Sequence, residues 1–272
     1  MLIIRIISNN LFPLSWSEIP KFDLGRYLRF GGLPPVYLSP SPHEELRAYV
    51  SVYLQEEIRA EGIIRRLPPF TRFLRVAALS SGQLLNYTQI ASDAEVPAST
   101  VREYFSVLED TLVGWTLEPW RESRKRKAIQ TAKFYFFDPG VMHEVAGTTS
   151  LDRNSDLYGR SFEHFIGMEL RAYVSYARTG DSMHFWRSTH GHEVDFLVGG
   201  RVAVEVKATR KASLRDARGL RAMAEEKTAT RLILVSEDPV VARRDGIEFL
   251  PWATFLSRLW AGDIVRPSKS AR

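Results

Sequence analysis

Apolar positions recur at helical spacing in the first part of the chain, which predicts a helical N-terminal segment over residues 1–66. Residues 43–66 carry apolar side chains every three or four positions, and a proline pair at 68–69 ends this predicted helix. A short apolar run at residues 1–7 precedes it. We therefore expect short elements followed by one long helix.

The middle of the chain has the pattern of two helices joined by a short turn. Residues 88–95 fit a helix capped by Asn86 or Thr88, and the step at Val96 and Pro97 interrupts it. A second, longer helix is predicted from one shared apolar face, formed by Val101, Tyr104, Phe105, Leu108 and Leu112.

Two apolar runs, 113–120 and 133–138, follow these helices and are separated by a basic segment at 121–127. A hairpin with a basic tip beside a helix-turn-helix is typical of a winged helix. The pattern therefore predicts a winged-helix domain over residues 67–147.

Alternation between apolar and polar residues dominates the last third of the chain, after a polar link at 148–156. The pattern predicts a mixed α/β domain over residues 157–262. Its expected elements are a helix at 157–177, strands at 183–187, 193–198 and 201–208, a helix at 214–227, a strand at 231–236 and a helix at 252–260. The tail 266–272 is expected to be disordered.

Composition narrows the classes of function. The chain has 272 residues, a net charge of +5 and no cysteine, which excludes disulfides and thiolate zinc sites. The mild basic excess fits a nucleic-acid partner. The apolar run at residues 1–7 is too short for a membrane span and is not followed by a signal-peptide cleavage site. We expect no membrane association and a cytoplasmic location.

Acidic and basic side chains are concentrated on one predicted hairpin. The pair Gly199-Gly200 is a strong signal for a two-residue turn, so the strands on either side should be antiparallel neighbours. Because side chains alternate along a strand, Glu205 and Lys207 should project from one face of the second strand. On the first strand Val194, Phe196 and Val198 form the expected apolar set, opposite Glu193 and Asp195.

Paired carboxylates with a lysine suit a divalent cation such as Mg²⁺ or Mn²⁺, which prefers hard oxygen ligands. Asp195 and Glu205 are the candidate ligands, and the main-chain carbonyl of Val206 is a further candidate. Lys207 would orient the attacking water. The alternative is a solvated cross-strand ion pair. The preceding acid, the hairpin and the order of elements together favour the metal site.

One spacing is similar to the PD-(D/E)XK nuclease signature: Asp195 is followed, after nine residues, by Glu205-Val206-Lys207. Val194 stands in place of the proline of that signature. The resemblance implies a restriction-endonuclease-like fold, with metal ligands at Asp195 and Glu205 and a water-assisting lysine at Lys207. Such nucleases often carry a further acid on the first helix, where this chain has Glu163. A solvated carboxylate beside Arg160 is the alternative reading of Glu163.

A wider resemblance covers nearly the whole chain. It is carried by the segments 31–34, 81–87, 133–140, 185–187 and 193–196. They resemble the C-terminal half of a large family of predicted prokaryotic AAA-type ATPases, a domain of unknown function of the 4143 type. That half is expected to contain a winged helix and a nuclease-like end.

The phosphate-binding loop that marks the ATPase half of that family is not found in this sequence. The chain has no G-x-x-x-x-G-K-[S/T] sequence, although residues 11–19 resemble the segment that closes the ATPase module. We expect a truncated or split member that does not hydrolyse ATP by itself, with a separate ATPase subunit as a possible partner.

Other candidate residues point to nucleic acid or to metal. Those expected to contact DNA open the second helix or lie on the basic tip, namely Ser99, Thr100, Arg102, Arg124, Lys125, Arg126 and Lys127. The alternative is a winged helix that serves as a protein or interdomain contact. The cluster His190-Gly191-His192-Glu193 resembles a zinc site, but a solvated turn is favoured because no further spaced ligands follow.

Three functions remain open from the sequence. The first is Mg²⁺-dependent phosphodiester hydrolysis of DNA. The second is a non-catalytic module that binds DNA or protein, and the third is an accessory or toxin-antitoxin-like component of an AAA-type ATPase system.

Overall fold

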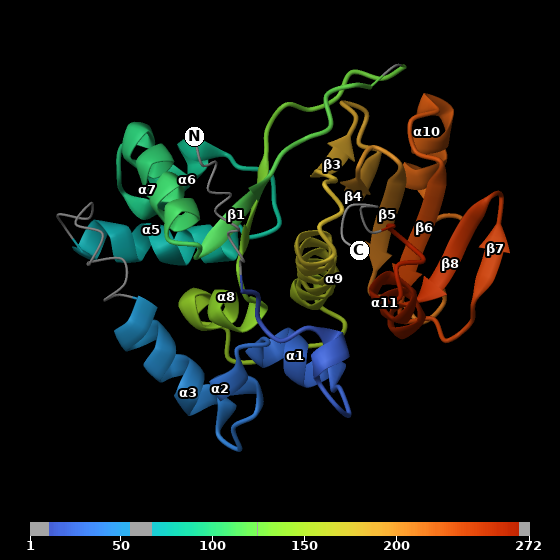
Figure 1. The fold of residues 1–272 in the computed structure, drawn as a ribbon. Helices are drawn as coiled ribbons and strands as arrows, with labels where there is room; N and C mark the ends of the chain where they lie inside the picture. The colour runs from blue at the N-terminus through green and yellow to red at the C-terminus, as the bar shows by residue number, and fades with distance from the viewer. Residues whose placement is uncertain (1–10, 55–66, 124, 267–272) are drawn as a thin grey trace, which may run out of the picture.

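The computed structural model describes residues 11–54, 67–123 and 125–266. The apolar run at 1–7, the second half of the helix predicted over 43–66, and the basic residue Arg124 lie outside the described residues. Figure 1 shows a helical part built from the first half of the chain beside a sheet built from the second half. The predicted mixed α/β class, with helices first and strands later, is confirmed at this level.

Short helices open the described chain. They are α1 (Leu24–Phe30), α2 (Pro34–Tyr37) and α3 (Pro42–Ala48), and α3 continues into a π-helical turn at Tyr49–Leu54. A short 3₁₀ turn, Trp16–Glu18, precedes them. The helix predicted from residue 43 thus begins within one residue of its expected start.

A compact helical layer follows, formed by α5 (Leu67–Leu79), α6 (Tyr87–Ala94), α7 (Ala98–Asp110) and α8 (Pro139–Ala146). Asn86 caps α6 by accepting the amide of Gln89 at 3.1 Å, and Glu95 ends it with a left-handed φ of 54°. The two predicted helices at 88–95 and from 98 onward are therefore confirmed as elements.

Strands β1 (Gly114–Leu117) and β2 (Lys133–Phe136) pair antiparallel and lie between the two halves of the molecule. Along β2 the side chains alternate between two cores. Phe134 and Phe136 pack into the helical layer, whereas Tyr135 packs into the central core shared with the sheet. This alternation also places Lys133 on the side of the sheet, as its ion pairs show.

A close contact joins residues 31–32 to the start of α8. Asp138 accepts the amide of Val141 at 3.0 Å and the amide of Gly32 at 2.8 Å. A Cβ on Gly140 would lie 2.1 Å from the carbonyl oxygen of Phe30, so only glycine allows this approach. Two of the segments that carry the wider resemblance thus meet here.

In the described residues the larger sheet has six strands in the order β3-β4-β5-β6-β8-β7. The strands are β3 (Met183–Arg187), β4 (Glu193–Val198), β5 (Val202–Lys207), β6 (Arg231–Ser236), β7 (Ala242–Arg244) and β8 (Ile247–Pro251). Strands β5, β6 and β8 run parallel, and the outer pairs run antiparallel. Strands β7 and β8 were not among the predicted elements.

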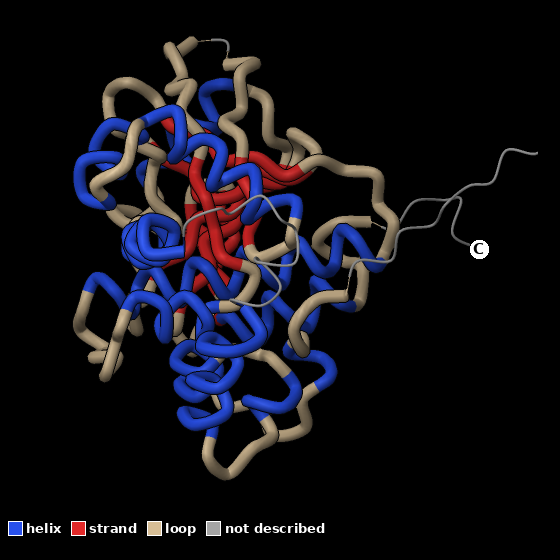
Figure 2. Tube along the Cα trace, turned by 90° about the vertical axis from the view of Figure 1, so that its left-hand side faces the viewer, coloured by secondary structure: helices blue, strands red, loops and turns tan. Residues whose placement is uncertain are grey.

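Helices cover both faces of this sheet, which stands at the centre of the molecule in Figure 2. Helices α9 (Asp156–Tyr176) and α11 (Trp252–Trp260) pack on one face, where Phe162, Phe165 and Phe255 join the core. Helix α10 (Arg218–Glu226) packs on the other face. The helix predicted at 214–227 is shorter than expected, since residues 214–217 form a turn before it.

The hairpin at β4 and β5 forms as predicted. Gly199 and Gly200 both have positive φ, 55° and 66°, and Phe196 pairs with Val204. Val202, Val204 and Val206 bury one face of β5 in the central core, as expected.

The prediction that Val194, Phe196 and Val198 share one apolar face of β4 is wrong for Val194. Phe196 and Val198 lie in the central core, but Val194 lies in the core under α10. The register between β3 and β4 shifts between His184 and Trp186, so β4 contains one extra residue there. Such a bulge breaks the two-residue alternation that the sequence pattern assumed.

The described residues between β1 and β2, 118–123 and 125–132, extend along the edge strand β3 (Figure 1), and we call them the arm. Trp120 donates its amide to Phe185 at 2.7 Å, and Ile129 donates its amide to Arg187 at 2.8 Å. The arm therefore connects the helical part to the edge of the sheet. Among the helices in the described ranges, none combines the length and apolarity needed to cross a bilayer.

Candidate metal centre and nucleic-acid interface

The residues of the predicted metal site lie just beyond the paired part of β4 and β5. Asp195 stands near the start of β4, and Glu205 and Lys207 stand near the end of β5. An oxygen of Asp195, Oδ2, accepts the amide of Val206 at 2.8 Å, and Lys207 Nζ lies 3.1 Å from Glu205 Oε1. The hairpin thus brings the two carboxylates and the lysine of the motif into one neighbourhood, although no hydrogen bond joins Asp195 to Glu205.

The second oxygen of Glu205 anchors helix α10. Glu205 Oε2 accepts the amide of Leu220 at 3.2 Å, in the first turn of that helix. Gly219 makes the approach possible, because a Cβ there would lie 1.6 Å from the main-chain oxygen of Glu193. The carboxylate therefore faces the N-terminal end of α10, where free amides favour negative charge.

Asp195 is the acid with the least compensated charge in this cluster. Its side chain is 5% exposed, and burial raises its pKa to about 8, with a further increase from the charge of Glu163. The charges of Lys207 and Lys133 oppose this increase. Among the residues described, the ion pairs of the cluster involve Glu163, Glu193 and Glu205 rather than Asp195.

Lys207 remains charged in this setting. Burial by itself lowers the pKa of Lys207, but the carboxylates of Asp195 and Glu205 raise it, and the net shift is above the ordinary value. The side chain is therefore an ammonium donor rather than a proton acceptor at neutral pH. Burial and Lys207 act on Glu205 in the opposite senses, and the net pKa of Glu205 is raised.

Glu163 lies on α9 and is held by two side chains from β2. Tyr135 donates its hydroxyl to Glu163 Oε1 at 2.6 Å, and Lys133 Nζ lies 3.2 Å from the same oxygen. Lys133 Nζ also lies 2.7 Å from Glu193 Oε1, and Arg187 lies 3.2 Å from Glu193 Oε2. Glu163 is thus not the isolated, solvated carboxylate beside Arg160 that was the alternative reading.

Lys133 and Tyr135 were missed by the sequence reasoning. The segment 133–140 was singled out only for its family resemblance, and nothing local connects it to an acid thirty residues later. The available signal was the i, i+2 spacing of Lys133 and Tyr135 on a strand whose intervening residues are apolar. Burial lowers the pKa of Lys133, but Glu163 and Glu193 raise it well above its ordinary value, so its ammonium stays charged.

Two polar cavities meet at Lys207. One has a volume of about 380 Å³ and is lined by residues that include Glu193, Glu205, Lys207, Arg215 and Arg218. The other has a volume of about 550 Å³ and lies between the start of α9 and the end of β5, with Glu163, Val206 and Lys207 on its wall. The cluster is therefore reached from both sides of Lys207.

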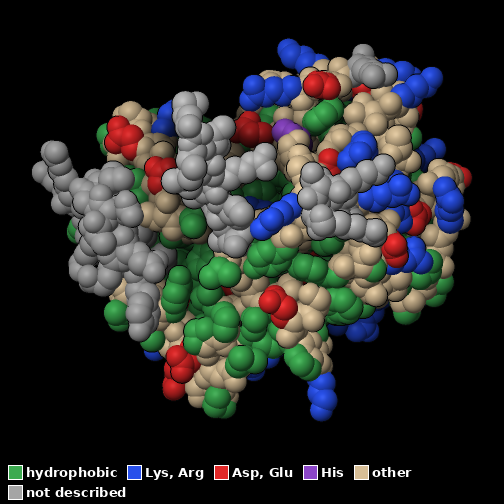
Figure 3. All heavy atoms as spheres, in the orientation of Figure 1, with side chains coloured by type: hydrophobic (Ala, Val, Ile, Leu, Met, Phe, Trp, Pro, Cys, Tyr) green, Lys and Arg blue, Asp and Glu red, His purple; other side chains and the backbone are tan. Residues whose placement is uncertain are grey.

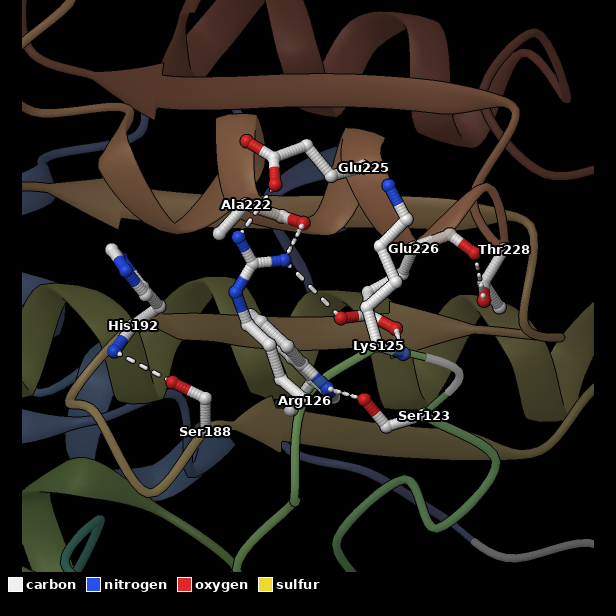
Figure 4. Close-up of polar contacts among 10 residues, drawn as sticks. Ser123, Lys125, Arg126, Ser188, His192, Ala222, Glu225, Glu226 and Thr228 are labelled. Atoms are coloured by element: carbon white, nitrogen blue, oxygen red, sulfur yellow. Dashed lines mark hydrogen bonds and ion pairs between the residues drawn. The ribbon is translucent and has the colours of Figure 1, made fainter.

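The turn that resembled a zinc site borders the first cavity. His190 and His192 line its wall together with Glu205 and Lys207. His192 donates its amide to Ser188 Oγ at 3.2 Å, which closes the turn between β3 and β4 (Figure 4). In the described part of the chain no three His, Asp or Glu side chains are already grouped closely enough to hold one ion.

The donor set fits a divalent cation of the hard, oxygen-preferring kind. Asp195 and Glu205 are both 5% exposed, so both carboxyl groups are withdrawn from water, and carboxylate oxygens are the ligands that such a cation prefers. The cluster holds four acids, Glu163, Glu193, Asp195 and Glu205, against the cations Lys133, Lys207 and Arg187. The buried Asp195 has no ion pair in the described residues, and a bound cation would favour its ionised form.

The residues predicted to read DNA open helix α7. Ser99 and Arg102 are exposed, and Thr100 is half-buried. The guanidinium of Arg102 lies 4.2 Å from the ring centroid of Tyr87 on α6, so it is held against the surface rather than extended. These residues lie at the start of α7 (Ala98–Asp110), as the pattern predicted.

Part of the basic segment 121–127 contacts helix α10. Arg126 lies 2.6 Å from Glu225 and 3.3 Å from Glu226, and it donates to the carbonyl of Ala222 at 3.2 Å (Figure 4). The amide of Lys125 donates to Glu226 Oε2 at 2.7 Å. Arg126, which the sequence pattern predicts to contact DNA, thus joins the arm to α10.

The remaining basic residues of the arm stay accessible. Lys125 and Lys127 are exposed, and Arg124 lies outside the described residues. Figure 3 shows Lys and Arg side chains gathered along the top and upper right of the molecule, over the arm and the sheet.

Comparisons with known proteins agree with a two-part chain. Residues 158–255 match the model of a domain of unknown function, DUF4143, and residues 21–152 match another, DUF8612. The 4143-type resemblance is thus confirmed for the C-terminal part, whereas it had been expected over nearly the whole chain.

Two curated relatives are similar over most of the chain. Uncharacterized proteins of Mycobacterium tuberculosis and Mycobacterium bovis are each 28% identical to it over 242 residues, which is 85% of this chain and 53% of each relative. The chain spans about half the length of the curated relatives it matches. No solved structure matches.

Proposed function

We propose that this protein is a divalent-metal-dependent DNA nuclease of the PD-(D/E)XK type, which hydrolyses phosphodiester bonds at the cluster of Asp195, Glu205 and Lys207. The observation that carries the proposal is the pair of buried carboxylates beside a charged lysine, just beyond the paired part of β4 and β5. A structural ion pair would need only Glu205 and Lys207. The buried Asp195, with its pKa raised to about 8, has no structural partner of opposite charge at ion-pair distance in the described residues.

Asp195 and Glu205 would hold a Mg²⁺ or Mn²⁺ ion, with Glu163 supporting it by charge and the main-chain carbonyl of Val206 as a further ligand. The ion would supply Lewis-acid chemistry toward the scissile phosphodiester. The hydrogen bond from the amide of Val206 fixes Asp195 Oδ2, and the amide of Leu220 fixes Glu205 Oε2. Each carboxylate thus keeps its other oxygen for a ligand or a neighbour.

Lys207 would donate a hydrogen bond to the attacking water and to the developing charge on the phosphate oxygens. Its ammonium is suited to that role because Asp195 and Glu205 keep it protonated. The cavities on both sides of Lys207 give a DNA backbone two routes of approach. Arg215 and Arg218, both exposed at the edge of the first cavity, would contact flanking phosphates.

Metal titration tests this proposal directly. We expect calorimetry with Mn²⁺ to give a binding isotherm for the wild type and none for the double variant Asp195→Ala/Glu205→Ala. Removal of groups behind metal ligands lowers metal affinity by roughly 10–100-fold, so removal of two ligands should exceed that. Cleavage of supercoiled plasmid with Mg²⁺ should be lost in the same variant.

The matched control is Glu44→Ala/Glu45→Ala, which removes two acids in the first turn of α3, far from the sheet in Figure 1. It should bind Mn²⁺ and cleave DNA as the wild type does. Wild-type protein that neither binds Mn²⁺ nor cleaves plasmid would contradict the nuclease proposal.

A second candidate function is DNA or partner binding without catalysis. We propose that α6, α7, β1 and β2 form a winged helix, and the exposure of Ser99 and Arg102 at the start of α7 favours a binding role for it. Because Arg126 is occupied by Glu225 and Glu226, Arg102→Ala should lower affinity for duplex DNA more than Arg126→Ala does.

Fluorescence anisotropy with a labelled duplex at several salt concentrations measures this difference. The slope of affinity against salt should become shallower in Arg102→Ala, since one phosphate contact is lost. Equal affinities in both variants and the wild type would remove α7 from the DNA interface and favour a protein partner. In a split AAA-type system that partner would be a separate ATPase subunit, testable by co-purification with the product of a neighbouring reading frame.

A further inference from the structure

The polar cluster at the candidate metal centre contains a cation that belongs to the other half of the molecule. Lys133 lies on β2, within the part of the chain that matches DUF8612, whereas the acids it contacts lie on α9 and β4 of the part that matches DUF4143. Its side chain is 4% exposed and touches Glu163 at 3.2 Å and Glu193 at 2.7 Å. The two matched parts therefore share one buried charge network.

Several contacts hold this ammonium in place. The alternation of β2 directs Lys133 and Tyr135 to the sheet side while Phe134 and Phe136 fill the helical core. Lys133 Nζ also lies 5.4 Å from the ring centroid of Phe185 on β3. A flexible surface lysine would not be fixed on three sides by an aromatic ring and two carboxylates.

The consequence concerns the number of cations that the cluster can accept. Two-metal nucleases place their ions about 3.5–4 Å apart and need acids enough for both. Here Glu163 and Glu193 are neutralised by Lys133, with Arg187 adding to Glu193. Asp195 then has no ion pair in the described residues, and Glu205 is paired with Lys207.

We propose that Lys133 is a positioning residue that acts as a built-in second cation: it holds Glu163 and Glu193 and limits the acid cluster to a single divalent ion at Asp195 and Glu205. This inference rests on the proposed function, because it concerns the same metal centre. It also gives the β2 segment a functional reason to contact α9 and β4.

Mn²⁺ titration of Lys133 variants tests it. Wild type should bind one equivalent of Mn²⁺ per chain, and Lys133→Met should bind two, because Glu163 and Glu193 lose their internal cation. Lys133→Arg, which keeps the charge, should bind one equivalent. The double variant Lys133→Met/Glu163→Gln, with one acid fewer, should also return to one equivalent.

A purely structural lysine would not change the stoichiometry. One equivalent in a folded Lys133→Met protein would therefore overturn the inference while leaving the proposed function intact. If the wild type binds no Mn²⁺, both the proposed function and this inference fail. Wild type with two equivalents would overturn the inference alone.

Removing a buried cation from two acids endangers folding, so a second measurement leaves Lys133 unchanged. Glu193→Gln should keep the Mn²⁺ affinity of the wild type, since Glu193 is committed to Lys133 and Arg187. Asp195→Asn, the matched substitution at a proposed ligand, should lose roughly tenfold or more. A comparable loss in Glu193→Gln would show that Glu193 binds the ion and would overturn the inference.

Discussion

Two buried histidines join neighbouring elements through neutral rings. His143 on α8 lies 2.9 Å from Ser161 Oγ, and His164 on α9 lies 2.7 Å from the carbonyl oxygen of Phe136. Burial lowers the pKa of His143 to about 3, helped by the charge of Arg29, and burial lowers the pKa of His164 to about 4. Both rings are therefore uncharged in the folded protein at neutral pH.

Acid should weaken the contribution of His143 to stability. The unfolded chain takes up a proton at His143 below its ordinary pKa of about 6.5, whereas the folded protein does not until about pH 3. Stability is therefore lost as pH falls through this window, by about 2 kcal/mol between pH 7 and pH 5. Urea unfolding of wild type and His143→Gln at both pH values should show the difference between them shrinking at pH 5. An unchanged difference would contradict the buried neutral ring.

At the scale of elements, glycine decides how closely α10 approaches the hairpin. The helix meets β4 and β5 at Gly219, next to the amide that Glu205 accepts. On α9, Gly159 has open space around its would-be Cβ, with no atom within 4 Å. These two helical glycines therefore form a matched pair with opposite surroundings.

Gly219→Ala should destabilise the fold and displace α10 from the candidate metal centre. The new Cβ would lie 1.6 Å from the main-chain oxygen of Glu193, and overpacking of this kind costs about 1–3 kcal/mol. Gly159→Ala should instead be neutral or stabilise by about 0.4–1 kcal/mol, because it only restricts the unfolded chain. Guanidinium unfolding of both variants measures the contrast. Equal behaviour of the two would mean that α10 does not need the close approach.

At the scale of the molecule, the two halves share their cores. The central core contains Tyr27 from α1 and Trp115 from β1 together with Phe165 from α9 and Phe196 from β4. Strand β2 contributes side chains to this core and to the helical core as well. The arm adds ion pairs between Arg126 and α10 at the far edge. We therefore expect the two halves to unfold together.

Aromatic truncations in different cores should move the same transition. Phe73 is fully buried in the helical core, and Phe165 is fully buried in the central core. Phe73→Ala and Phe165→Ala should each lower the free energy of unfolding by roughly 3–5 kcal/mol. Circular dichroism and tryptophan fluorescence should report one coincident transition in each variant. Two separate transitions, with only one shifted by Phe73→Ala, would show that the halves fold independently.

Much of the secondary structure follows from the sequence because its signals are local. Strands at 183–187, 193–198 and 231–236 and the helix at 252–260 match their predicted bounds, since alternation and helical spacing depend on near neighbours. The Gly199-Gly200 turn belongs to the same class, because two positive φ values are a property of the residues themselves. Strands β7 and β8 were missed because they are short or lie beside turns that carry no strong alternation.

The candidate metal centre divides in the same way. Spacing alone predicts that Glu205 and Lys207 lie close together on one strand. It also predicts that Asp195 lies on the neighbouring strand, across a tight turn. The face of β4 on which Val194 lies could not be derived from spacing, because a bulge against β3 shifts the alternation of side chains. The contacts of Lys133 and Tyr135 with Glu163 could not either, because they join residues about thirty positions apart.

The sequence by itself determined many of the elements, though not β7 and β8, together with the hairpin and the acids and lysine that it carries. The tertiary structure alone decided which charges those acids meet. Packing of β2 between two cores places Lys133 against Glu163 and Glu193, and packing of the arm on β3 places Arg126 against α10. The periodicity of apolar residues predicts which face of an element is buried. Which residues contact that face depends on how the whole chain packs.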